Sequence, residues 1–302
     1  MSRPSSGKEI VVGIDPRDPS VPTLAWAADE ADRVHLPLRL VLAVPPLHDT
    51  QHVDSAPHRM SLQAQGREAL LAATGTVLRL TPHAHVATEL VDGAPAAVLC
   101  RYAAAPTTHV VVIGSRRLSR PEEIFSTASV AVPLSAQAEC PAVVVRAPEH
   151  TAPGPARLVV GVDGSESSQQ ALGFAFEEAG LRQASVHAVW VWQRPLLGLG
   201  RAEAGADERA RILSESVARW PGRYPDVKLT QEVRQGHPVE ELARASSAAL
   251  AVVVGRRGRG GYTGMRLGSV VHGLLHRGEC PVITVPGSAV RELWPGCPGG
   301  SG

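Results

Sequence analysis

A glycine- and arginine-rich segment near the end of the chain has the residue types that bind phosphate. It contains Gly255, Gly258 and, after nine intervening residues, the pair Gly268–Ser269. Glycine lets a ligand approach the backbone closely and lets the chain adopt positive φ. Four side chains of the segment carry the charge and donor geometry that match phosphate, namely Arg256, Arg257, Arg259 and Arg266. We interpret the segment as a phosphate-binding loop.

The position of this segment between two predicted elements supports the same interpretation. An apolar stretch at 251–254 predicts a buried strand, and the pattern after the segment predicts a helix that begins near Ser269. The first N–H groups of a helix and its partial positive charge favour an anion there. Ser269, predicted at or next to the N-cap, could cap the helix or donate to a phosphate oxygen. The alternative interpretation is a surface connection without a ligand.

The spacing Gly255-x2-Gly258-x9-Gly268-Ser269, followed by a helix and the stretch 280–285, resembles the nucleotide-binding signature of the universal stress protein family, in its ATP-binding branch. Other phosphate loops fit less well. No G-x-x-x-x-G-K-[ST] motif occurs, and the only lysines are Lys8 and Lys228. A dinucleotide loop would follow the first strand of a βαβ unit, whereas this segment follows the fourth strand of its repeat.

The resemblance implies ATP as the ligand, with Mg²⁺, and it implies where the parts of the nucleotide lie. Adenine and ribose are expected near Asp163 and the backbone around Val191, and the triphosphate along the glycine-rich segment. Asp163 could instead cap its own turn, and Val191 could be a core residue. The binding residues expected from the resemblance are Asp163, Gly164, Ser165, Val191, Gly255, Arg256, Gly258, Arg259, Gly268, Ser269 and Val270.

An internal repeat is the strongest evidence for the architecture. Residues 157–163 repeat residues 10–15 with an offset of 148 between the two aspartates, Asp163 and Asp15. Later pairs of matching residues have smaller offsets of 143, 141 and 140, which shorter loops between fixed elements would produce. These pairs are Gly93 with Gly236, Gly114 with Gly255 and Cys140 with Cys280. Strands alternate with helices, and the strands are continuously apolar, which favours a parallel sheet covered on both faces.

We therefore predict an α/β fold with two tandem Rossmann-like, doubly wound domains, each with a five-stranded parallel sheet flanked by helices. The predicted organisation is a disordered start at 1–8, a first domain at 9–147, a linker at 148–156, a second domain at 157–287 and a flexible tail at 288–302. The resemblance to the stress protein family covers nearly the whole chain.

The first repeat departs from the nucleotide signature. Gly114 is kept, but Arg117 replaces the second glycine, and Ser129 follows an alanine. Residues 122–123 are glutamates, whose charge would repel phosphates. We predict one competent nucleotide site for each chain, in the C-terminal half, with the N-terminal repeat as a structural or pairing partner. Whether the first repeat also binds nucleotide through Asp15, Gly114 and Ser129 stays open.

The composition excludes few function classes but gives no sign of a nucleic-acid or membrane partner. The 302 residues are 44% hydrophobic and 20% charged, with a net charge of +1. No basic patch dominates, and no apolar run has membrane-spanning length. The start of the chain has no signal-peptide core, and the four cysteines show no C-x-x-C pairing. These features predict a cytoplasmic protein.

No enzyme motif is found, and we predict neither catalytic residues nor a metal site. The histidines at 48, 52 and 58 are expected in a solvated loop, although such a loop could fold around a metal. His272 and His276 share one helix face at a spacing that can chelate a metal. Strands 142–145 and 282–285 could pair within one chain, hiding their edges, and a homodimer of chains is a further possibility.

Three functions compete at this stage. The leading hypothesis is an ATP-binding, nucleotide-responsive stress or regulatory factor without an efficient catalytic cycle, although slow ATP hydrolysis is compatible with it. The first alternative is an enzyme of similar architecture, such as an ATP-pyrophosphatase or a relative of electron-transfer flavoproteins, which would need a phosphate loop after the first strand or a substrate domain. The second alternative is an interaction module that binds no nucleotide.

Overall fold

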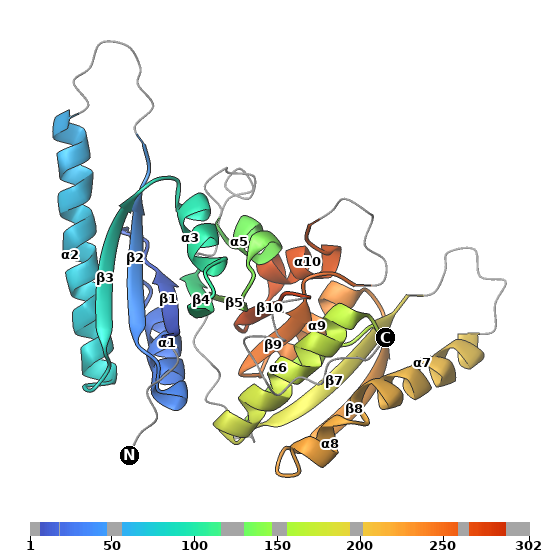
Figure 1. Ribbon diagram of the computed structural model, residues 1–302. Helices are drawn as coiled ribbons and strands as arrows, with labels where there is room; N and C mark the ends of the chain where they lie inside the picture. The colour runs from blue at the N-terminus through green and yellow to red at the C-terminus, as the bar shows by residue number, and fades with distance from the viewer. Residues whose placement is uncertain are drawn as a thin grey trace, which may run out of the picture. The chain divides into compact units, whose positions relative to one another are not determined.

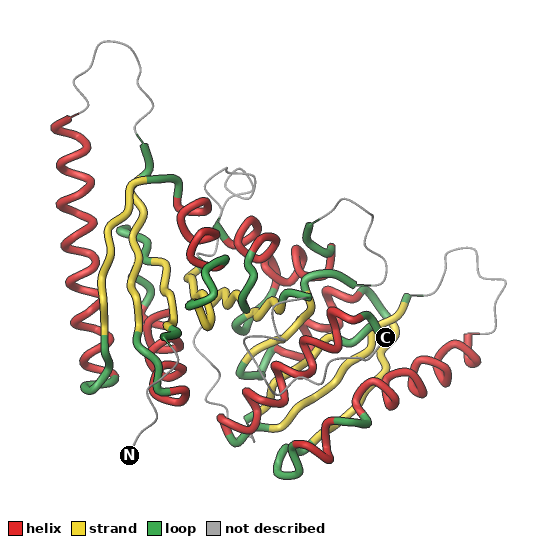
Figure 2. Tube along the Cα trace, viewed as in Figure 1, coloured by secondary structure: helices red, strands yellow, loops and turns green. Residues whose placement is uncertain are grey.

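The computed structural model describes residues 7–17, 19–46, 56–115, 130–146, 156–193, 202–258 and 266–287. The chain divides into two compact units, Met1–Arg146 and Ala147–Gly302. Figure 1 shows the elements of both units with their labels, and Figure 2 shows the same trace coloured by secondary structure. Each unit is a parallel five-stranded sheet flanked by helices, so the predicted fold class is confirmed.

The N-terminal domain has its strands in the order β3-β2-β1-β4-β5, all parallel. Helices α1 and α2 pack together on one face of the sheet, and α3 packs against α5. The elements run β1 (Glu9–Gly13), α1 (Val21–Val34), β2 (Leu38–Val44), α2 (Ala56–Leu80), β3 (Val86–Asp92), α3 (Pro95–Ala103), β4 (Thr108–Gly114), α5 (Ala131–Gln137) and β5 (Ala142–Val145).

The C-terminal domain repeats this arrangement with the order β10-β9-β6-β7-β8. Helices α6 and α7 flank the sheet, and α9 packs against α10. The elements run β6 (Arg157–Gly161), α6 (Glu166–Arg182), β7 (Ser185–Trp192), α7 (Ala202–Val217), α8 (Trp220–Arg223), β8 (Leu229–Gln235), α9 (Pro238–Ser246), β9 (Ala251–Gly255), α10 (Ser269–Arg277) and β10 (Val282–Val285).

The strand sequences explain why each sheet is sandwiched between helices. In β4 every residue except the last is buried, and the first four residues of β9 are buried as well. A strand that is apolar on both faces is stable only where both faces are covered, as in a parallel sheet. The core of each domain therefore lies along its central strands.

The repeat extends to unusual backbone conformations. His35 and Gln183 end α1 and α6 with φ values of 54° and 51°, in the left-handed region. Gly93 and Gly236 have φ values of 144° and 153° just before α3 and α9. Residues with a side chain rarely adopt positive φ, yet His35 and Gln183 both do so at equivalent positions. Together with the two matching glycines, they show that the two domains share their turn geometry.

The two elements predicted on either side of the glycine-rich segment lie where the sequence indicated, since β9 covers Ala251–Gly255 and α10 begins at Ser269. Among the described helices, none combines the length and apolar character needed to cross a bilayer.

Candidate functional site

The carboxyl ends of β6 and β9 bring the predicted site residues of the C-terminal domain together. The strand order 10-9-6-7-8 reverses its direction of progress between β6 and β9, because β7 and β8 extend the sheet on one side of β6 and β10 extends it beyond β9. Ligands of open parallel sheets bind beside such a switch point. Asp163 follows β6 closely, and the glycine-rich segment begins at Gly255, the last residue of β9.

Asp163 and Ser165 build the turn that starts α6. Asp163 Oδ1 accepts a hydrogen bond from the Ser165 N–H at 3.0 Å, and Gly164 between them has a φ of 75°. Ser165 is the N-cap of α6, and its Oγ accepts from the Ser168 N–H at 3.1 Å. The turn-capping role considered for Asp163 is therefore present, through its Oδ1 atom.

The glycine-rich segment runs directly over this turn. A Cβ atom at Gly258 would collide with Asp163 Oδ2, and one at Gly255 would collide with the backbone carbonyl of Ser167. The Arg257 N–H donates to Ser167 Oγ at 3.3 Å. Two of the predicted glycines are thus needed for close approach between segments of the protein itself, and neither has a positive φ.

Gly268 differs from these two glycines. The nearest atom to a Cβ placed there is the Arg256 carbonyl oxygen at 3.4 Å, which is an ordinary contact. The Gly268 N–H donates to the same oxygen at 3.0 Å, which closes the segment into a loop. The fold around the described residues therefore does not itself require a glycine at 268.

The loop ends at the start of α10. Gly268 is the N-cap and Ser269 is the first helical residue, so Ser269 lies next to the N-cap as predicted, and the N-cap makes no side-chain capping hydrogen bond. Ser269 is exposed, and the first N–H groups of the helix, including that of Val270, have no intrahelical acceptor. These donors and the helix dipole favour an anion at the start of α10.

The remaining predicted residues lie at different places. Val191 is at the carboxyl end of β7, the strand next to β6, and it is partly exposed rather than a core residue. Arg257 and Arg266 are exposed. Arg259 lies outside the described residues, as do Arg117, Ser129, His48 and His52. His58 lies in α2, so its predicted place in a loop was wrong.

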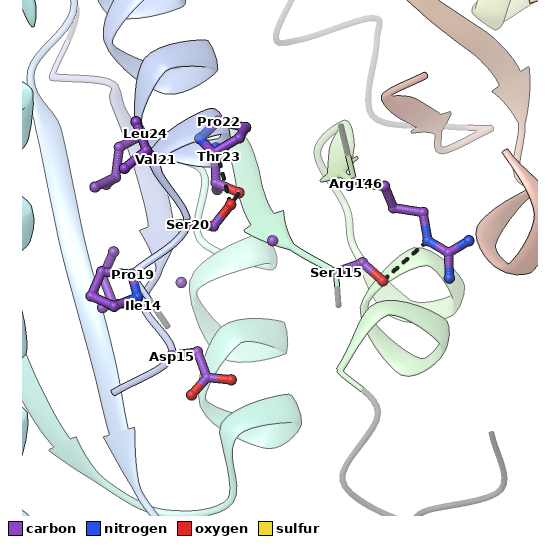
Figure 3. Close-up of a pocket in the computed structure, with 12 residues that line it drawn as sticks. Ile14, Asp15, Pro19, Ser20, Val21, Pro22, Thr23, Leu24, Ser115 and Arg146 are labelled. Carbon is purple, nitrogen blue, oxygen red and sulfur yellow. Dashed lines mark hydrogen bonds between the residues drawn. The ribbon is translucent and has the colours of Figure 1, made fainter. Parts of the chain in front are cut away.

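The equivalent place in the N-terminal domain holds a cavity of about 620 Å³. Figure 3 shows Asp15 on one side of it and Ser115 with Arg146 on the other. Arg146 Nε donates to Ser115 Oγ at 3.4 Å. The cavity is lined by Gly13, Ile14, Asp15, Pro19, Ser20, Val21, Pro22, Thr23, Leu24, Gly114, Ser115 and Arg146.

Sequence reasoning missed most of this cavity. Ser20 is the N-cap of α1, and its Oγ accepts from the Thr23 hydroxyl at 2.9 Å. A Cβ atom at Gly114 would lie 2.9 Å from Thr23 Oγ1, so the end of β4 packs tightly on the first turn of α1. The sequence signal was a serine two residues before Pro22, which is typical of a helix start, but nothing in the sequence placed it beside Gly114.

The repeated cysteines are core residues rather than reactive thiols. Cys140 and Cys280 are buried beside β5 and β10. Burial raises the pKa of the Cys140 thiol to about 12 and also raises the pKa of the Cys280 thiol. A thiol that stays protonated is a poor nucleophile, so these residues supply no catalytic chemistry.

Comparison with known proteins gives the same fold and repeat. The model of the universal stress protein family matches twice, over residues 7–146 and 156–286. The chain belongs to the universal stress protein family. The two matches cover most of the chain, so it is a tandem universal stress protein.

Individual universal stress proteins align over most of the chain. Universal stress protein Rv2623 of Mycobacterium tuberculosis is 34% identical over 298 residues, with 94% of this chain and 98% of the relative covered. Universal stress protein Rv2005c of the same organism is 33% identical over 299 residues, with the same coverage. A crystal structure of a universal stress protein from Archaeoglobus fulgidus has the same fold, with a TM-score of 0.71 at 16% identity over 93% of this chain and 96% of that one.

Proposed function

We propose that this universal stress protein binds ATP in its C-terminal domain and acts as a nucleotide-responsive stress or regulatory factor. The observation that carries the proposal is the loop from β9 to α10. Its described residues lie against Asp163 at Gly258, and it ends at Gly268, where a Cβ atom would meet only ordinary contacts, just before the first N–H groups of α10. In this proposal the adenosine lies near Asp163 and Val191, and the phosphates lie along the loop.

The residues present fit a bound triphosphate. Backbone N–H groups at the start of α10 and the Arg256 side chain would hold phosphate oxygens. The ion that accompanies ATP in this proposal is Mg²⁺, which prefers oxygen ligands and retains several waters. Asp163 Oδ2 is the carboxylate oxygen of the site that does not cap the Ser165 N–H. We assign no catalytic residue, and we expect hydrolysis, if any, to be slow.

The test is substitution of Gly268 by leucine in the nucleotide-stripped protein. The fold has room for a Cβ at this position, so the variant should fold while its side chain fills the space expected for phosphate. We expect the affinity for ATP with Mg²⁺, measured by calorimetric titration, to fall by at least about tenfold.

The matched control is Gly222→Leu. A Cβ at Gly222 meets no atom within 4 Å, so this variant adds the same side chain at a distant surface position. It should bind ATP as the wild type does. Equal affinity in the wild type and Gly268→Leu would overturn the assignment of the loop. No binding by the wild type would instead favour an interaction module that uses this fold without nucleotide.

A further inference from the structure

Two histidines lie on consecutive turns of α10, on the side of the helix away from the core. The buried side consists of Val271, Leu274 and Leu275. His272 is exposed and His276 is partly exposed. Their ring centroids are 4.7 Å apart, and the ring planes make an angle of 56°. The two imidazoles are thus neighbours but are not stacked.

This separation matches that of two imidazoles bound to one metal ion. With a metal–nitrogen distance of about 2.0–2.1 Å, the centroid of a bound imidazole lies about 3.2 Å from the metal. Two rings bound at an angle between about 90° and 110° then have centroids about 4.5–5.2 Å apart. The distance between His272 and His276 falls within this range, so the helix already holds the rings at a chelating separation.

The position along the helix also favours a cation. His276 belongs to the last turn of α10, where the helix dipole is negative. Arg277 in the same turn is within 3.3 Å of Glu240 on α9, so a carboxylate partly compensates its charge. In the N-terminal domain the equivalent positions, 140 residues earlier, are Val132 and Ala136. The repeated fold therefore does not need histidine at either place.

We propose that His272 and His276 form a binding site for a late first-row divalent metal ion, such as Cu²⁺, Ni²⁺ or Zn²⁺. Imidazole nitrogen favours these ions, whereas Mg²⁺ and Ca²⁺ prefer oxygen. Within the described ranges no group of three or more His, Cys, Asp or Glu side chains forms a metal site, so water completes the coordination and the ion exchanges readily. The proposal departs from the sequence-based expectation of no metal site and does not depend on ATP binding.

The experiment is a titration of the untagged, full-length chain with Cu²⁺ in the absence of nucleotide. Electron paramagnetic resonance should show a Cu²⁺ signal with hyperfine structure from two imidazole nitrogens. Substituting either histidine, in His272→Ala or His276→Ala, should lower the affinity by about 10–100-fold and remove the two-nitrogen signature. The control His83→Ala removes another exposed histidine and should leave both unchanged.

A second measurement locates the ion at the level of residues. Diethyl pyrocarbonate modifies accessible imidazoles, and bound Cu²⁺ should protect His272 and His276 but not His83. Circular dichroism of the metal-free variants checks that α10 still folds. The proposal is overturned if both single variants retain the wild-type affinity and signature, or if Cu²⁺ leaves the modification of His272 and His276 unchanged.

Discussion

His109 shows how a single buried residue can make the stability of one domain depend on pH. It lies in β4, where its side chain is only 6% exposed. Burial, and to a smaller extent the charge of Lys8, lowers its pKa to about 4. Since the charged form of a buried imidazole is disfavoured, the native N-terminal domain keeps His109 neutral under conditions in which the unfolded chain takes up a proton.

The expected consequence is a loss of stability as the pH falls from about 6.5 to about 4. In this window the unfolded chain binds a proton that the native domain excludes, so the free energy of unfolding decreases with decreasing pH, by up to about 3 kcal/mol. Above pH 6.5 the effect is absent. The internal repeat supplies the matched substitution, because Leu250 occupies the equivalent position of the C-terminal domain.

We therefore predict that His109→Leu flattens the pH dependence of the N-terminal unfolding transition between pH 4 and pH 6.5. Urea denaturation at several pH values measures it, and the transition of the C-terminal domain serves as the internal reference. An unchanged slope in the variant would show that His109 does not carry the pH dependence.

At the scale of elements, close packing between α9 and α10 holds the helix that starts at the candidate site. Gly273 of α10 faces Val239 of α9, and a Cβ at Gly273 would collide with both γ-carbons of Val239. Valine is stiff at χ1 and cannot swing its methyl groups aside. The distance between the helices is therefore set by the absence of a side chain at 273.

Gly273→Ala should for this reason lower the free energy of unfolding of the C-terminal domain by about 1–3 kcal/mol, despite the higher helix propensity of alanine. The double variant with Val239→Ala should recover part of this loss, because it removes the methyl groups that collide. Thermal denaturation of the single and double variants measures the coupling between the two positions. Simple additivity of the two substitutions would contradict the proposed contact.

At the scale of the whole molecule, the fold followed from the sequence because each of its main signals occurs twice. The aspartates Asp15 and Asp163 come after similar apolar stretches, and the buried cysteines precede the last strand of each domain. Such local patterns can be recognised in the sequence without knowledge of the tertiary contacts. The resemblance to the stress protein family also implied that Asp163 lies near the glycine-rich segment, and the pairing of β6 with β9 places Asp163 beside Gly258.

Other features could not be predicted from the sequence, because they depend on contacts between residues that are distant in sequence. The approach of Gly114 to Thr23 spans 91 positions and gives no periodic signal. Likewise, a glycine-rich motif suggested positive φ, but Gly255 and Gly258 are glycines because other parts of the chain pass too close for a side chain. The sequence pattern predicts that glycine is needed at these positions. Tertiary packing determines why it is needed there.

The two domains lead to opposite expectations about how many nucleotides one chain binds. The N-terminal domain has the cavity with Asp15, but its loop lacks the second glycine and carries two glutamates. The C-terminal domain has the complete set of glycines, and a Cβ atom at Gly268 would meet only ordinary contacts. Because close approach of three phosphates needs both the glycines and a favourable charge, we predict a stoichiometry of one ATP for each chain.

Calorimetric titration of the nucleotide-stripped wild-type chain with ATP and Mg²⁺ measures this stoichiometry. Two variants then show which domain binds the nucleotide. Asp15→Ala should leave the titration unchanged, whereas Asp163→Ala should weaken binding, because it removes the carboxylate that lies against the loop at Gly258. Two binding events, one of them lost in Asp15→Ala, would mean that the cavity of the N-terminal domain is itself a nucleotide site. In that case Ser115 and Arg146 would replace the missing glycines as the phosphate contacts.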